Sequence, residues 1–139
     1  MSDTFAGLRV LITGGSSGIG AGLAEAFAAA GATVGIAARR HDRLTEVLDR
    51  CRVHSPGSTM WTLDLTDDAS VDRLAVEAVE SLGGVDILVN NAGIPKRRHV
   101  TRLDAATVAS VMAVNYLSPV RLTLALLPHM IERLSLIHI

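Results

Sequence analysis

Short apolar runs alternate along the chain with segments whose apolar residues recur at helical spacing. Four short, mostly apolar runs have the length of buried strands, and we expect strands at residues 8–13, 33–38, 59–63 and 85–89. Helical spacing predicts helices over residues 18–30, 42–51, after Thr66, over 104–116 and from Ser118 onward. Thr66 is expected to cap its helix, as is Ser118, whose successor Pro119 suits a first helical position.

The order of these elements predicts the fold class. Strands that are apolar throughout, and that alternate with helices, indicate a parallel sheet covered on both faces. Right-handed crossovers then favour an α/β, doubly wound, Rossmann-type sheet with strand order 3-2-1-4. We expect one nucleotide-binding domain over residues 1–133, truncated before the later strands of such a fold. Its fourth strand should then lie at an exposed edge of the sheet.

Composition excludes several classes of function. The net charge of -1 gives no reason to expect a nucleic-acid partner. The single cysteine, Cys51, cannot form an internal disulfide, and the five histidines are scattered without metal-ligand spacing. The first residues do not resemble a signal peptide, and we see no apolar stretch long enough to span a membrane. We therefore expect a cytoplasmic protein without metal or membrane partners.

A glycine-rich segment, TGGSSGIG at residues 13–20, lies between the first strand and the first helix. Backbone N–H groups at a helix start favour anions, and glycines allow a pyrophosphate to approach the backbone. We expect this loop to hold a dinucleotide through Gly14, Ser16, Ser17, Gly18, Ile19 and Gly20. The segment lacks the lysine of a P-loop, and its glycine spacing differs from GxGxxG. The alternative is a tight turn that binds nothing.

The loop resembles the TGxxxGxG motif of the short-chain dehydrogenase/reductase family. Further similarities follow in the family's order: AARR, DLTD, NNAG and MAVNYLSP, so that the resemblance extends from about Leu8 to Arg133. It implies an NAD(P)-dependent oxidoreductase that interconverts a carbonyl and an alcohol by hydride transfer on a small molecule. It also implies a homodimer or homotetramer for the complete protein, because the last two helices commonly form an interface in this family.

Resemblance also assigns positions around the cofactor. Asp64 and Leu65 match positions that contact the adenine through a carboxylate and a backbone N–H. Asn90, Ala92 and Gly93 match the segment that lines the nicotinamide ribose. For Asn91 we expect a structural role, with a bond across to a neighbouring strand end. The alternative for Asp64 is an ordinary turn residue after a strand.

The end of the second strand bears on the choice of cofactor, because this position meets the adenosine ribose in a doubly wound sheet. An acidic residue there would repel a 2′-phosphate, but the sequence has Ala38, Arg39 and Arg40. A guanidinium can hold a phosphate with two parallel hydrogen bonds. We expect Arg39 to bind this phosphate, with NADP(H) preferred and NAD(H) possible. The alternative, a solvated loop residue, is the interpretation we give to Arg40.

The family's catalytic group is represented here by a single residue. Resemblance assigns Asn115 to the catalytic asparagine, the alternative being a polar residue tolerated at a helix kink. The family also uses a serine and a tyrosine with a lysine four residues later. Tyr116 is the only tyrosine and Lys96, the only lysine, precedes it. We expect this chain to bind nucleotide without turnover; a catalytically inactive nucleotide-binding or regulatory module is the second hypothesis.

Residues 134–139 match neither the glycine turn nor the fifth strand that the family has at this point. Their last residues, SLIHI, resemble the translation of a sequencing adapter. We interpret the segment as an anomalous tail that is not native sequence. A genuine chain end is the alternative.

Overall fold

The computed structural model describes residues 3–133 and 137–138 of the chain. The strands are β1 (Arg9–Thr13), β2 (Thr33–Ala38), β3 (Thr59–Thr62), β4 (Ile87–Val89) and β5 (Ile137–His138). The α-helices are α1 (Gly18–Ala29), α2 (His41–Arg52), α3 (Asp68–Leu82), α4 (Ala105–Met112) and α5 (Ser118–Glu132). A short 3₁₀ turn, Val100–Arg102, precedes α4, and a π-helical turn, Ala113–Leu117, joins α4 to α5.

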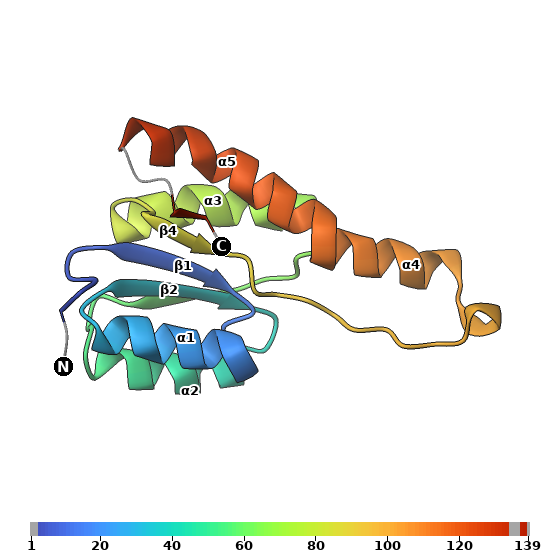
Figure 1. Cartoon of the computed structure of the whole chain (residues 1–139), viewed down its shortest axis with the longest axis horizontal. Coiled ribbons are helices and arrows are strands. Elements are labelled where there is room, and N and C mark those ends of the chain that lie inside the picture. The colour runs from blue at the N-terminus through green and yellow to red at the C-terminus, as the bar shows by residue number, and fades with distance from the viewer. Residues whose placement is uncertain (1–2, 134–136, 139) are drawn as a thin grey trace.

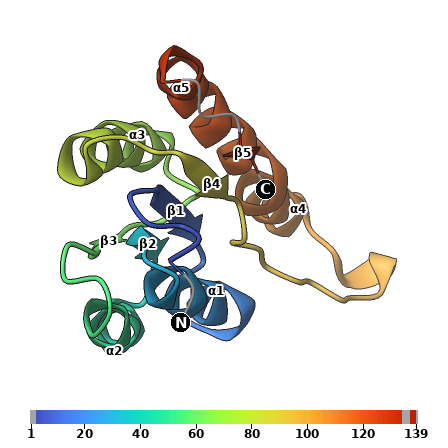
Figure 2. The ribbon, with the colours of Figure 1, turned by 60° about the vertical axis from the view of Figure 1, so that its left-hand side comes forward.

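All strands are parallel and lie in the order β3-β2-β1-β4-β5, which confirms the predicted 3-2-1-4 arrangement (Figure 1). Helices α1 and α2 cover one face, and α3 and α5 cover the other (Figure 2). Successive residues of β1 point to opposite faces, so Val10 and Ile12 join the first core and Leu11 the second. Because both faces are covered, the strands are apolar without alternation.

The expectation that β4 lies at the edge of the sheet is wrong. β5 pairs with its outer side, with Ile87 opposite Ile137 and Leu88 opposite His138. An edge strand presents unpaired N–H and C=O groups, and a short extended segment that reaches it can pair with them. The interpretation of residues 134–139 as an anomalous tail falls mostly outside the described residues, which include only residues 137 and 138 of this segment.

The start of α3 also differs from the prediction. The residue at the cap position is Asp67, not Thr66. Thr66 is engaged elsewhere, because its N–H and its hydroxyl both donate to Oδ1 of Asp64, at 2.9 and 2.8 Å. The threonine therefore belongs to the turn that leads into the helix cap.

The two last predicted helices form one continuous helix, Ala105–Glu132, with the π-helical turn at its centre. Ser118 therefore does not cap a helix; its buried hydroxyl donates to the carbonyl of Leu65. Pro119 lacks an N–H, and its ring needs space against the preceding turn. A π-helical turn before it widens the helix at this point, which explains why the helix continues through a proline.

This joined helix is 28 residues long, and an 18-residue stretch of it has a mean hydropathy of 1.3, so by length and composition it could span a membrane, contrary to our expectation. Length and composition alone do not distinguish such a span from a helix of a folded domain. Here the inner face packs into the second core with the fully buried side chains of Leu122, Leu126 and Met130. Arg121 on the same helix forms ion pairs with Asp68 and Asp72 of α3. The α5 part of the helix is thus packed into the domain, whereas α4 has no buried residue.

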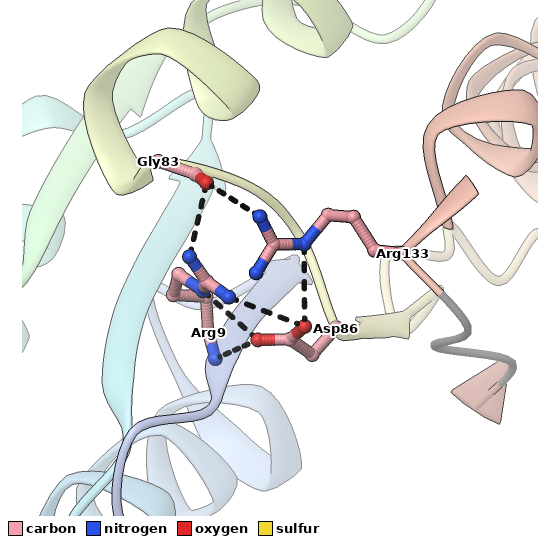
Figure 3. Close-up of polar contacts among 4 residues, drawn as sticks. All are labelled: Arg9, Gly83, Asp86 and Arg133. Atoms are coloured by element: carbon pink, nitrogen blue, oxygen red, sulfur yellow. Dashed lines mark hydrogen bonds and ion pairs between the residues drawn. The ribbon is translucent and has the colours of Figure 1, made fainter. Parts of the chain in front are cut away.

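A polar cluster joins α5 to the end of the sheet where the strands begin (Figure 3). Asp86, 5% exposed, accepts hydrogen bonds from the backbone N–H and Nε of Arg9 at 2.8 and 2.9 Å. Arg133 lies 3.8 Å from the other carboxylate oxygen, and both arginines donate to the carbonyl of Gly83. The buried carboxylate is therefore surrounded by the two guanidinium groups that it requires.

Candidate nucleotide-binding site

A pocket of about 300 Å³ opens where β1, β2, β3 and β4 end. In open α/β sheets this carboxyl edge is where ligands bind, because the loops that follow the strands leave a crevice there. The lining residues come from the loops after all four strands and from the π-helical turn: Gly14, Ser16, Ser17, Ala38, Arg39, Arg40, Leu63, Asp64, Leu65, Asn91, Ala92, Gly93, Ile94 and Val114.

The glycine loop forms the floor of this pocket. Gly14 has a positive φ of 69°, a conformation that glycine adopts without strain, and its N–H donates to the carbonyl of Ala37 at 2.8 Å. At the start of α1, Ser17 makes no capping hydrogen bond with its side chain, and the first turn contains no acidic residue. The N–H groups of this turn are therefore not neutralised by a side chain of the helix start, which suits an anion.

The loop after β4 holds the glycine loop in place. Nδ2 of Asn91 donates to the carbonyls of Thr13 and Gly14, both at 3.2 Å, and the N–H of Ala92 donates to Oγ1 of Thr13. The predicted bond from Asn91 to a neighbouring strand end is thereby confirmed. Because an amide donates both bonds, the ends of β1 and β4 are kept at a fixed separation.

Two arginines follow β2 at the pocket. Nη2 of Arg40 donates to the hydroxyl of Ser17 at 2.8 Å and so bridges the end of β2 and the start of α1. The prediction that Arg40 is a solvated loop residue and that only Arg39 meets the cofactor is incomplete, because both residues line the pocket. The adjacency of Arg40 to the strand end was the available signal, and the sequence could not show the side on which its side chain lies.

The opposite wall is the turn after β3. The carboxylate of Asp64 accepts the hydrogen bonds from Thr66 described above, and the N–H of Asp67 donates to the carbonyl of Asp64 at 3.1 Å. The two bonds from Thr66, the one from its backbone N–H foremost, hold the pKa of Asp64 below its ordinary value, and the charge of Arg39 lowers it further. Asp64 is therefore an ionised acceptor at neutral pH.

Asn115 lies in the π-helical turn and contacts the backbone after β4. Its Oδ1 accepts from the N–H of Ile94 at 2.8 Å, and its Nδ2 donates to the carbonyl of the same residue at 3.0 Å. This two-bond contact fixes the segment that contains Gly93 and Ile94 against the long helix. Asn115 therefore acts on the pocket wall from behind and is not itself a lining residue.

The predicted cofactor residues divide into two groups. Eight line the pocket: Gly14, Ser16, Ser17, Arg39, Asp64, Leu65, Ala92 and Gly93. Gly18, Ile19, Gly20 and Asn90 do not line it. Ile19 is 77% exposed, and Nδ2 of Asn90 donates to the hydroxyl of Thr123 on α5. Sequence reasoning missed Ile94, although it directly follows the predicted Gly93. It also missed Val114, because the rotation of a helix against a distant loop leaves no local signal.

The chain matches known proteins over nearly its whole length. The family model described as short chain dehydrogenase matches residues 9–135. A fatty acyl-CoA reductase of Mycobacterium tuberculosis is 40% identical over 131 residues, which cover 91% of this chain and 44% of that protein. The mouse dehydrogenase/reductase SDR family member 7B is 38% identical over 128 residues, 89% of this chain and 40% of that protein. The chain thus spans less than half of either relative.

Solved structures of short-chain dehydrogenases resemble this chain in fold as well as in sequence. The crystal structure of L-sorbose reductase from Gluconobacter frateurii, complexed with NADPH and L-sorbose, has a TM-score of 0.88 and 32% identity over 96% of this chain and 51% of that one. A short chain dehydrogenase from Burkholderia cenocepacia, in complex with NADP, has a TM-score of 0.85 and 32% identity over 91% and 52% of the two chains. With the family match over residues 9–135, these findings show that the chain belongs to the short-chain dehydrogenase family.

Proposed function

We propose that this chain is the nucleotide-binding part of an NADP(H)-dependent oxidoreductase that transfers a hydride between the cofactor and a carbonyl or alcohol substrate. The observation that carries the proposal is the meeting of two anion-binding features in one pocket: the start of α1 without a side-chain cap, and the arginines after β2. The neighbours that were solved with NADPH and with NADP support the same cofactor class.

The residues present suit each part of such a cofactor. The glycine loop and the first turn of α1 would hold the pyrophosphate, and Arg39 would bind the 2′-phosphate. The ionised Asp64 and the N–H of Leu65 would contact the adenine. Asn90, Ala92 and Gly93 would border the nicotinamide ribose, with Asn115 holding that segment through Ile94. When bound, the nicotinamide supplies the hydride.

The proton chemistry of the family is not carried by residues 1–139. Neither Tyr116 nor Lys96 forms a pair with the family's spacing, and Tyr116 lies exposed on the long helix. We therefore propose that this chain binds NADP(H) without turnover. Incubation with NADPH and a panel of aldehydes and ketones tests this: steady oxidation of NADPH above the rate without protein would refute it. Location in the cytoplasm stays a prediction.

A second copy of the chain is the partner that we propose for the long helix. Apolar side chains recur at every fourth position on its outer face and are between 40% and 63% exposed: Val108, Met112, Tyr116, Val120 and Leu124. An apolar helix face of this kind is ordinarily packed against another part of the protein or against a second chain. Sedimentation should show a dimer that Leu124→Glu converts to a monomer. A monomeric wild type at high micromolar concentration would refute the proposal.

Cofactor preference is the direct test of the proposed function. We expect NADPH to bind roughly 10- to 100-fold more tightly than NADH, the size of a charge-assisted contact. Arg39→Asp should reverse this order. Arg43→Ala is the control, because it removes an exposed charge on α2. The ion pair of Arg43 with Glu46 is long, at 3.7 Å, and its loss should leave the preference unchanged. Tighter binding of NADH to the wild type would refute the proposal.

A further inference from the structure

The turn after β3 contains one peptide group that is held at both of its ends. The hydrogen bond from the N–H of Asp67 to the carbonyl of Asp64 closes a four-residue turn, and its central peptide joins Leu65 to Thr66. In turns of this kind the central peptide has two main orientations, related by a flip that distinguishes type I from type II. The orientation of this group decides where both neighbouring residues present their polar atoms.

At one end, the N–H of the peptide, which belongs to Thr66, donates to Oδ1 of Asp64 at 2.9 Å. At the other end, the carbonyl of Leu65 accepts a hydrogen bond from the hydroxyl of Ser118. A flip of the peptide would break both bonds together. The bond from Ser118 therefore also keeps the carboxylate of Asp64 in the orientation that the structure shows.

Ser118 reaches this turn from a distant part of the chain. It is 3% exposed, and Val114, one helical turn earlier, lines the pocket itself. Arg121, one turn later, binds Asp72 through two bonds of 2.7 Å. One face of the helix thus holds both the turn after β3 and the start of α3, so the pocket wall does not depend on the turn alone.

We propose that Ser118 is a positioning residue for adenine recognition, which it controls by fixing the central peptide of the turn from Asp64 to Asp67. The inference rests on the proposed function, in which Asp64 and Leu65 contact the adenine. It goes further by assigning the shape of that adenine site to a side chain that lies behind the wall. The side chain itself need not touch the nucleotide.

A comparison of two nucleotides tests this role. The amino group of adenine can donate to a carboxylate, whereas hypoxanthine presents a carbonyl oxygen at the same position. We define adenine preference as the Kd of the hypoxanthine analogue of NADPH divided by the Kd of NADPH, both from fluorescence titration. In the wild type we expect a preference of roughly tenfold, the size of a hydrogen bond to a charged group.

In Ser118→Ala we expect a roughly three- to tenfold weaker binding of NADPH, the size of one buried hydrogen bond, and an adenine preference that falls from roughly tenfold to about one- to threefold. The matched control is Ser58→Ala. Ser58 is 1% exposed, and its hydroxyl accepts from the N–H of Val34 at the opposite end of the sheet. It should lose stability with unchanged preference. If Ser118→Ala does not fold, Ser118→Cys keeps the side-chain size with a weaker donor, and its preference should also fall.

Each outcome decides between the proposals. An unchanged preference in a folded Ser118 variant, or an equal loss of affinity for both nucleotides, would overturn the positioning role while the proposed function stands. A wild type that binds NADPH but does not distinguish the two bases would also overturn the positioning role alone. A wild type that binds neither nucleotide would overturn the proposed function together with it.

Discussion

Gly20 is the position where the glycine loop tolerates a side chain least. It lies in the first turn of α1, and a Cβ built on it would meet the carbonyl carbon of Gly14 at 2.9 Å, with the carbonyl oxygen and Nδ2 of Asn91 closer still. The Gly14 atoms belong to the backbone, so a rotamer change cannot relieve the overlap. Gly20→Ala must therefore move the glycine loop away from the helix or displace Asn91.

The cost can be worked from these contacts. Overpacking by one carbon costs about 1–3 kcal/mol, and the two bonds from Asn91 to Thr13 and Gly14 contribute about 0.5–1.5 kcal/mol each. The overpacking and the loss of the two hydrogen bonds together should lower the free energy of unfolding by about 2–6 kcal/mol. A domain of this size loses about 3–4 °C in Tm for each kcal/mol, so we expect Tm to fall by about 6–24 °C.

Gly22→Ala provides the control within the same helix. Gly22 is exposed, and among the described residues no atom outside its own helical neighbourhood lies within 4 Å of a Cβ built there. Alanine should therefore stabilise the helix by about 0.4–1 kcal/mol. Calorimetry should show opposite shifts for the two variants, and NADPH binding should be lost only in Gly20→Ala. A Gly20→Ala protein that melts like the wild type would refute the reasoning.

Three further predictions concern single groups. In urea unfolding, Asp86→Ala should lower the free energy of unfolding by about 3–5 kcal/mol, because it leaves the half-buried Arg9 without its carboxylate. The control Glu46→Ala, which breaks an exposed ion pair, should cost under about 1 kcal/mol. Similar costs for the two variants would contradict the prediction. Burial raises the pKa of Cys51 to about 11, so a thiol reagent at pH 8 should react only with the unfolded chain; rapid labelling of the folded protein would be inconsistent with it. The pKa of Asp64 in the folded protein lies below its ordinary value of 3.8. Its ionised form therefore contributes fully to stability above about pH 3.8, and this contribution is lost as the pH falls through the pKa of the folded state. An NMR titration midpoint at or above 3.8 would exclude this.

Most of the sheet could be predicted because its signals are local. The apolar runs gave β1 and β2 within one residue, since strands buried on both faces admit few polar residues. The order of the strands followed from the handedness of crossovers. The joined helix could not be predicted, because a cap such as Ser118 and a proline ordinarily indicate a helix start. Only a contact made 53 residues away, with Leu65, shows that the serine serves another purpose.

The candidate site was predicted where the chain itself forms a motif. The glycine loop, Asp64 and the residues after β4 come together because parallel strands end at one edge. Arg40 and Val114 were missed as lining residues because their side chains reach the pocket through a rotation that only packing determines. The contact of Ser118 with Leu65 was missed for the same reason. Sequence patterns thus located the floor of the pocket better than the contacts that hold its walls.

The strand order has a consequence for folding during synthesis on the ribosome. β1 is the central strand, and it is made before the other four strands of the described sheet. Its partner β2 follows closely, but Arg9 and Asp86, where β1 and the start of β4 meet, are 77 residues apart. At about 5–20 residues per second, a ribosome needs roughly 4–15 s to complete that distance. During this interval a nascent chain presents one side of an apolar strand without its partner, so yield in cells should depend on translation speed and on the chaperones that meet the emerging chain.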